Sequence, residues 1–207
     1  MGTTAKVKRI LKKLDELYPF DGVCFLHYRQ PWQLMVSTIL SAQCTDDRVN
    51  MVTEALFKEY PTPEALAEAD LTSLENAVRP TGFFRMKASN IKQSMEKLIT
   101  EYSGEMPSDI GLLTSFPGVG RKTANVIRSH VFQIPSIVVD THVKRVTYRL
   151  GLSKNTDPAR VELDLMEILP KSHWIRYNQQ IITHGRLVCK SQNPKCGECV
   201  FKKECVV

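Results

Sequence analysis

The sequence contains no apolar run that approaches the roughly 20 residues needed for a helix to cross a bilayer. Its first residues, MGTTAKVKRILKKL, lack the apolar stretch and the small-residue cleavage site of a secretory signal peptide. Internal repeats and low-complexity segments are also missing, which argues against solenoid and disordered architectures. We therefore expect a cytoplasmic protein that does not associate with membranes.

Alternating strand patterns are scarce too. The segment QIPSIVVD (133–140) is the best β candidate, but it is short and isolated. Elsewhere apolar residues recur at helical spacing, which predicts an all-α protein. Helices are expected near residues 7–17, 31–40, 49–60, 63–69, 71–79, 85–102, 109–115, 124–131, 143–150, 158–168 and 175–187.

The composition is that of a globular protein: 43% of the 207 residues are hydrophobic and 24% are charged. This length suits one compact domain or two small ones. No linker separates consecutive domains, so two lobes would have to be interwoven in sequence. The net charge of +6 is compatible with a polyanionic partner but does not establish one.

The six cysteines fall into two groups. Cys24 and Cys44 are isolated, and we expect each to be a small buried hydrophobic residue. The other four lie within the last nineteen residues with the spacing C-x6-C-x2-C-x5-C: Cys189, Cys196, Cys199 and Cys205. In a reducing compartment such a group is expected to bind metal rather than to form disulfides. Four thiolates can complete a zinc site or an iron–sulfur cluster, and the chemistry does not choose between them.

The segment FPGVGRKTANVI (116–127) contains two glycines followed by the cationic pair Arg121-Lys122. Gly118 and Gly120 permit positive φ on either side of Val119, and a helix pattern follows. Such a turn can be a tight connection without a ligand, or it can aim backbone N–H groups and a helix N-terminus at an anion. The segment fits a helix–hairpin–helix, which grips the DNA backbone without reading sequence.

Lys122 follows this turn directly. Alone it would be a solvated helix lysine, but behind an anion site it is a candidate nucleophile. A nucleophilic lysine must be neutral, and a helix N-terminus disfavours an ammonium by only about 0.3–2 kcal/mol. Because desolvation must supply the rest of the required lowering of its pKa, we expect Lys122 to line a partly buried cleft.

Asp140, in VVDTHVKRV (138–146), stands where a loop becomes a helix. Taken alone it predicts a helix N-cap, a position that aspartate fills well. A carboxylate close to Lys122 would favour the ammonium form and so oppose the effect of burial. His142 could orient Asp140, although packing near the helix start is the simpler role.

The chain resembles the endonuclease III-type DNA glycosylases. The matching segments are LSAQCTD (40–46), FPGVGRKTANVI, VVDTHVKRV, HGR (184–186) and the four-cysteine tail, in the order and approximate spacing of that family. The resemblance implies an all-α fold with one lobe of residues 21–133 and a second of residues 1–20 plus 134–207, with DNA bound between them. It also implies that Lys122 and Asp140 are catalytic.

The resemblance further implies residues that hold DNA. Gly118, Val119, Gly120 and Arg121 of the hairpin would contact the backbone. Gln43 and Phe83 match positions that enter the duplex when the damaged nucleotide is flipped out. The family usually has an aliphatic residue followed by tyrosine where this chain has Phe83-Phe84, so Phe84 is an alternative wedge. We assign neither a metal nor a catalytic role to His142 or His184.

The implied function is base excision repair of double-stranded DNA that carries a damaged base. We expect a monomeric DNA glycosylase and AP lyase that removes oxidised pyrimidines and nicks the strand through a lysine imine, nucleoid-associated in a prokaryote. The cysteine spacing matches the [4Fe–4S] motif of the family. Two alternatives are a monofunctional mismatch glycosylase, which Lys122 disfavours, and a non-catalytic DNA-binding module with a structural cluster.

Overall fold

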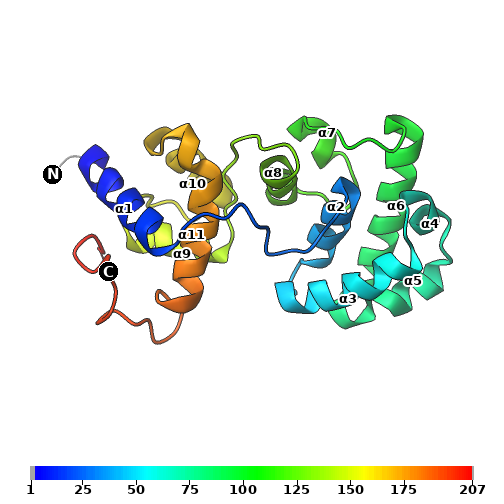
Figure 1. Cartoon of the computed structure of the whole chain (residues 1–207), viewed down its shortest axis with the longest axis horizontal. Coiled ribbons are helices and arrows are strands. Elements are labelled where there is room, and N and C mark those ends of the chain that lie inside the picture. Colours follow the sequence, from blue (N-terminus) through cyan, green and yellow to red (C-terminus); the bar gives the residue numbers. More distant parts are fainter. Residues whose placement is uncertain (1–2, 207) are drawn as a thin grey trace. The chain divides into compact units, whose positions relative to one another are not determined.

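The structure is a computed structural model that describes residues 3–206. All regular elements in this range are helical, which confirms the all-α prediction. They are α1 (Thr3–Leu17), α2 (Pro31–Leu40), α3 (Asp46–Glu59), α4 (Pro63–Glu68), α5 (Leu71–Val78), η1 (Arg79–Thr81), α6 (Phe84–Tyr102), α7 (Ile110–Thr114), α8 (Arg121–His130), α9 (Thr141–Arg149), α10 (Pro158–Ile168), η2 (Lys171–His173) and α11 (Trp174–Leu187). Figure 1 shows their arrangement.

The chain forms two compact units. One consists of Cys24–Gln133, and the other joins Met1–Val23 to Ile134–Val207. The second unit therefore contains both the N-terminal helix and the C-terminal third of the chain.

The unit Cys24–Gln133 is built around the long helix α6, which packs against α4, α5 and α2. Helix α2 also packs against α8, as Figure 1 shows. The apolar positions of α6 recur every three or four residues, and Ile91, Met95 and Leu98 are completely buried. This core holds the ends of α2, α6 and α8 in fixed positions within the unit.

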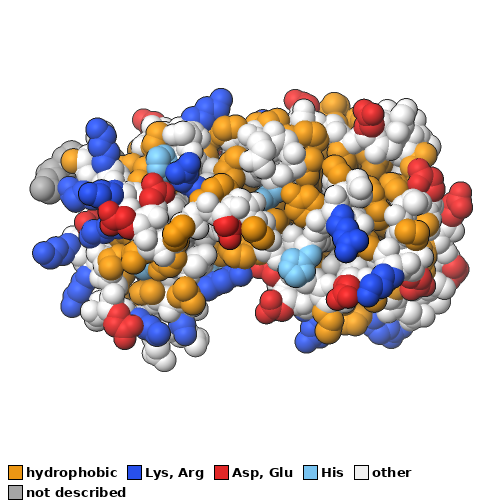
Figure 2. Space-filling view, viewed as in Figure 1, with side chains coloured by type: hydrophobic (Ala, Val, Ile, Leu, Met, Phe, Trp, Pro, Cys, Tyr) orange, Lys and Arg blue, Asp and Glu red, His pale blue; other side chains and the backbone are white. Residues whose placement is uncertain are grey.

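In the other unit α11 packs against α9 and α1, and α1 also contacts α10. Its core includes Leu14, Val143, Leu165 and Tyr177. The Tyr177 hydroxyl, completely buried, lies 3.1 Å from the Thr147 hydroxyl. On the face drawn in Figure 2, cationic side chains gather over α1 and the C-terminal segment.

The β candidate 133–140 forms no strand. Its backbone is paired instead with one amide side chain on α11. The Val138 N–H donates to Asn178 Oδ1 at 3.0 Å, and Asn178 Nδ2 donates to the Ser136 carbonyl at 3.0 Å. A buried asparagine thus takes the place of a partner strand, and it fixes the segment that leads into α9.

Helix α3 starts earlier than the apolar pattern indicates. The prediction placed its start near Val49, but the helix begins at Asp46. Thr45 caps it by accepting a hydrogen bond from the Arg48 N–H, and Asp46 and Asp47 lie in the first turn, where carboxylates are favourable. In the described residues no helix is long and apolar enough to span a membrane.

Candidate DNA-repair active site

The predicted hairpin is present as α7, a short turn and α8. Gly118 has φ +77°, and a Cβ at this position would lie 2.9 Å from Asn90 Nδ2 on α6. Glycine is therefore required here both by the backbone and by the neighbouring helix. The Ser94 hydroxyl, also on α6, donates to the Pro117 carbonyl at 2.9 Å and anchors the turn to the core.

Gly120 has a different reason to be glycine. Its φ of −87° and ψ of 177° are open to any residue, so the expectation of a special conformation applies to Gly118 alone. A Cβ on Gly120 would meet no heavy atom within 4 Å. Neither the backbone conformation nor the packing of the protein therefore requires glycine at this position. The absence of a side chain leaves the N-terminus of α8 accessible.

The start of α8 is suited to an anion. Its N-cap is Gly120, without a side-chain cap bond, and its first turn contains no acidic residue. The first N–H groups of a helix carry partial positive charge. Arg121 and Lys122, both exposed, add two cationic side chains. Val119 is only 4% exposed and packs into the core, and its N–H donates to the Phe116 carbonyl at 3.0 Å, so it shapes the turn rather than facing a ligand.

Lys122 occupies the first turn of α8, and its side chain is exposed. The expectation that it is partly buried in the free protein is therefore wrong. The apolar face of α8 begins two residues later at Ala124 and continues at Ile127. Lys122 lies outside this apolar face.

Asp140 is the N-cap of α9, as the loop-to-helix position predicts. Its Oδ1 accepts a hydrogen bond from the Val143 N–H at 2.7 Å, and its Oδ2 lies 3.0 Å from His142 Nδ1. The side chain is 15% exposed. Both carboxylate oxygens are thus oriented, and the cap leaves the group in contact with solvent. Asp140 belongs to the unit completed by Ile134–Val207, whereas Lys122 belongs to Cys24–Gln133.

Gln43 and Phe83 share an unusual backbone state. Gln43 has φ +53° and Phe83 has φ +47°, in the left-handed region that side chains seldom adopt. Both side chains are exposed, and Phe83 is 59% exposed despite its size. Phe84 instead contacts two guanidinium groups, with Arg79 at 4.8 Å and Arg85 at 5.3 Å from the centre of its ring. Phe83 is thus the more accessible of the two.

The four C-terminal cysteines line one cavity of about 330 Å³. Three cationic side chains line it as well: Arg149, Lys195 and Lys202. Arg149 Nη1 lies 3.4 Å from Cys189 Sγ and also donates to the Lys190 carbonyl. Burial raises the pKa of the Cys199 thiol, and the other three cysteines add to this shift, since four thiols lie close together. Cationic groups line the cavity beside the four cysteines, and within the described residues no three histidine, cysteine or acidic side chains are arranged to hold a metal ion.

Comparison with known proteins identifies the family. Residues 36–171 match the HhH-GPD superfamily of base excision DNA repair proteins. An endonuclease III of Synechocystis sp. is 49% identical over 201 residues, which cover 97% of this chain and 91% of the relative. The chain belongs to the endonuclease III family. An endonuclease III of Bacillus subtilis is 41% identical with the same coverage.

Solved structures agree with this assignment. A trapped covalent intermediate of endonuclease III and DNA has a TM-score of 0.94 and 42% identity, covering 100% of this chain and 97% of that one. A non-covalent endonuclease III–DNA complex has the same score and identity, with 100% and 96% coverage. A thermostable thymine-DNA glycosylase at 21% identity shares the fold, with a TM-score of 0.87. The predicted resemblance is confirmed.

Within this endonuclease III fold, sequence reasoning missed the residues that attach the cysteine segment. Arg145 donates to the carbonyls of Gly185 and Cys189. Gly185 of the HGR motif lets α11 approach α9, because a Cβ there would lie 3.1 Å from the His142 side chain. His184 is buried, with Nδ1 2.9 Å from the Tyr18 hydroxyl and Nε2 3.7 Å from Cys199 Sγ. Burial lowers the pKa of His184 to about 4, so the ring is neutral at pH 7.

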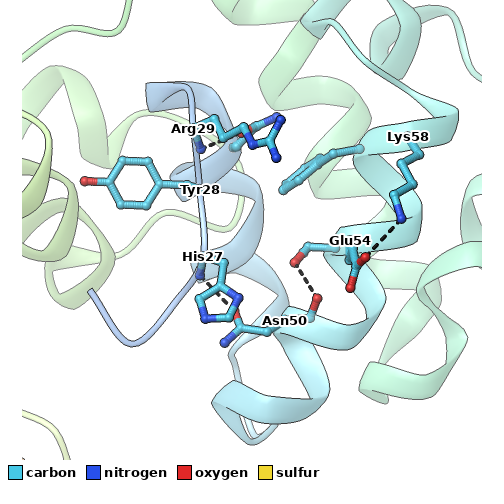
Figure 3. A pocket seen from close by; sticks show the side chains of 9 residues that line it. His27, Tyr28, Arg29, Asn50, Glu54 and Lys58 are labelled. Atoms are coloured by element: carbon cyan, nitrogen blue, oxygen red, sulfur yellow. Dashed lines mark hydrogen bonds and ion pairs between the residues drawn. The ribbon is translucent and has the colours of Figure 1, made fainter. Parts of the chain in front are cut away.

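One further pocket of the chain contains none of the predicted site residues. It has a volume of about 420 Å³ and lies between α3 and the segment before α2. Figure 3 shows His27 and Arg29 on that segment and Asn50, Glu54 and Lys58 on α3. Lys58 pairs with Glu54 at 2.9 Å, and Asn50 Oδ1 accepts from the His27 N–H. The Lys58 and Glu54 side chains and the Asn50 amide are therefore already paired within the protein.

Proposed function

We propose that this protein excises oxidised pyrimidines from double-stranded DNA and nicks the strand, with Lys122 as the nucleophile and Asp140 as the assisting carboxylate. The family is that of base excision DNA repair proteins. The observation that carries the assignment to Lys122 is its position in the first turn of α8, two residues after Gly120. Nothing in the protein itself requires a glycine at position 120.

The hairpin is proposed to hold a DNA phosphate. Backbone N–H groups at the start of α8 point toward the ligand, and the absent side chain of Gly120 allows the phosphate to approach within hydrogen-bond distance. Arg121 adds a cation beside it. With the phosphate held, the adjacent sugar lies within reach of a side chain from the same helical turn, which is where Lys122 is found.

Base removal breaks the bond between C1′ and the base, and the base leaves with the bonding electrons and takes up a proton. The sugar gains positive charge as in glycoside cleavage, and the Asp140 carboxylate can stabilise that charge or receive a proton from the amine. The Lys122 nitrogen bonds to C1′. Loss of its proton and opening of the C1′–O4′ bond, with protonation of O4′, then give an imine.

Strand cleavage follows from the same adduct. An imine withdraws electrons and makes the C2′ protons acidic. Loss of one C2′ proton forms a double bond between C2′ and C3′, and the 3′ phosphate departs with the electrons of its bond. Because Lys122 is exposed in the free protein, we propose that bound DNA rather than the protein core supplies the dehydration that favours a neutral amine.

Gln43 and Phe83 are proposed to fill the space left by the flipped nucleotide. Gln43 can hydrogen-bond the orphaned base, and Phe83 can insert between base pairs. Two observations support Phe83 over Phe84. The Phe83 ring is exposed, whereas Phe84 is already stacked on Arg79 and Arg85.

The cysteine cavity is proposed to hold a [4Fe–4S] cluster ligated by Cys189, Cys196, Cys199 and Cys205. The support for this proposal is that all four cysteines line the same cavity of about 330 Å³. When bound, the cluster would supply four iron–thiolate bonds that fix a segment with few apolar residues. A brown protein that contains iron is the expected result, and a colourless zinc protein would contradict this assignment.

Borohydride trapping tests the function. Incubated with an abasic duplex and reductant, the protein is expected to form a covalent complex that Lys122→Ala does not form. A panel of oxidised, deaminated and mismatched duplexes then identifies the base. Base release without trapping would indicate the monofunctional alternative, and binding without either activity would indicate a DNA-binding module. We propose that the enzyme acts as a monomer in the cytoplasm.

A further inference from the structure

A buried lysine connects the two segments that present Gln43 and Phe83. Lys87, in the first turn of α6, is 1% exposed. Its Nζ donates to the Leu40 carbonyl at 2.8 Å and to the Thr81 carbonyl at 2.7 Å. Leu40 lies three residues before Gln43, and Thr81 lies two residues before Phe83. One ammonium group therefore joins both segments within the same unit.

A buried ammonium group destabilises the folded state unless it is well paired, so the partners of Lys87 decide whether its charge is tolerated. In the described part of the chain, carbonyl oxygens rather than a carboxylate hold the Lys87 Nζ. Leu40 is the last residue of α2, so its carbonyl belongs to the negative end of a helix, where a cation is favourable. Burial lowers the pKa of Lys87, which shows that the surroundings still oppose the charge.

The segments that Lys87 joins are short and strained. Gln43 and Phe83 both adopt positive φ, and Gly82 beside Phe83 has φ +69°. Such backbone states persist only where the surroundings fix them. The Thr81 side chain is buried and donates to the Val78 carbonyl, which holds the start of the second segment. The bonds from Lys87 link this segment directly to the end of α2.

We propose that Lys87 is a positioning residue that fixes the Gln43 and Phe83 segments relative to each other, so that both side chains can enter the duplex together. This inference rests on the proposed function, in which these two side chains replace the flipped nucleotide. Lys87 does not contact the reacting atoms. Its contribution is confined to substrates in which a base must leave a stacked, paired helix.

The chain offers a control on the same helix in Lys92, whose side chain is 27% exposed and lies 3.9 Å from Glu96. Lys92 Nζ donates to the carbonyls of Ala67 and Ala69 and so joins α6 to the end of α4. This lysine also bonds two backbone carbonyls at a helix C-terminus, yet it holds no segment that carries a proposed DNA-inserting residue. Lys92→Met thus shows how much stability and activity are lost when such a link is removed away from the proposed DNA-inserting residues.

The test compares Lys87→Met and Lys92→Met on two substrates that contain the same abasic site, one single-stranded and one in a duplex. Single-turnover strand cleavage is measured on both, and thermal unfolding is recorded for each variant. Lys87→Met is expected to lower the duplex rate relative to the single-strand rate by at least about tenfold, the scale of effect expected from misplacing a group that must be correctly positioned. Lys92→Met is expected to leave this ratio unchanged.

A double-mutant cycle with Phe83→Ala provides a second readout. If Lys87 acts through this segment, Lys87→Met should reduce duplex cleavage much less in the Phe83→Ala background than in the wild type. An unchanged rate ratio, or fully additive losses, would overturn the proposal. If Lys87→Met does not fold, Lys87→Gln serves in both comparisons, with the same expected direction and the same contradicting outcomes.

The two failures are distinguishable. Absence of cleavage and trapping by the wild-type protein on either substrate would overturn the proposed function. Wild-type cleavage with equal loss on both substrates in Lys87→Met would overturn only the positioning role.

Discussion

Substitution by alanine is predicted to have different effects at the two glycines of the hairpin. Gly118→Ala places a Cβ on a backbone with φ +77° and brings it 2.9 Å from Asn90 Nδ2. Gly120→Ala places a Cβ on a backbone that any residue adopts, with no heavy atom of the protein within 4 Å. Gly118→Ala should therefore damage the protein, and Gly120→Ala should damage only the binding of DNA.

The magnitudes follow from these geometries. The left-handed backbone at Gly118 costs roughly 1–2 kcal/mol with alanine, before the contact with Asn90 is relieved. At Gly120 the reduced freedom of the unfolded chain stabilises by about 0.4–1 kcal/mol, which offsets the poorer N-cap. A methyl group that displaces a phosphate from a backbone N–H should remove a charged hydrogen bond worth about 1.5–3 kcal/mol, or roughly tenfold to a hundredfold in affinity.

The assay pairs thermal unfolding with fluorescence anisotropy on a duplex that carries an abasic-site analogue, at one fixed salt concentration because phosphate contacts are salt-dependent. Gly118→Ala should lower the Tm by roughly 2–8 °C relative to Gly120→Ala. Gly120→Ala should bind at least about tenfold more weakly than the wild type. Wild-type affinity in Gly120→Ala would refute the view that a phosphate approaches this glycine.

Two further predictions concern other parts of the unit Cys24–Gln133. Phe83→Ala should change the free energy of unfolding by less than about 0.5 kcal/mol because the ring is exposed, yet slow cleavage of a paired lesion more than that of a single-stranded one; equal slowing would exclude the wedge. Burial raises the pKa of the Cys24 thiol from 9.0 to about 11, so the folded state keeps a proton that the unfolded state loses. The free energy of unfolding should therefore fall by about 2–3 kcal/mol between about pH 9 and pH 11. Urea unfolding should show a smaller fall in Cys24→Ala. An identical dependence of unfolding free energy on pH in the two proteins would contradict the pKa shift.

Much of the site could be predicted from the sequence because local chemistry determines it. Asp140 caps α9, as a carboxylate at a loop-to-helix junction predicts. Pro117 and Gly118 specify the turn between α7 and α8. The different reasons for Gly118 and Gly120 were not predictable, since they depend on the backbone angles within the turn and on the position of Asn90 on α6.

Other features depend on contacts between distant segments. The apolar segment 133–140 has β propensity, but its backbone pairs with Asn178, about forty residues away in the chain, so no local pattern reveals the outcome. The exposure of Lys122 likewise depends on how α8 packs. Lys87 did leave a signal, because it lies four residues before Ile91 on the apolar face of α6, and a lysine in a core position predicts a buried polar contact.

In the proposed reaction the Lys122 amine bonds to the sugar of the damaged nucleotide. The most direct measurement reduces the protein–DNA adduct with borohydride, digests both components and locates the added sugar by mass spectrometry. Wild-type protein should carry a single modified side chain, Lys122, and folded Lys122→Ala should form no adduct. An adduct on a different lysine, or undiminished trapping by Lys122→Ala, would contradict it.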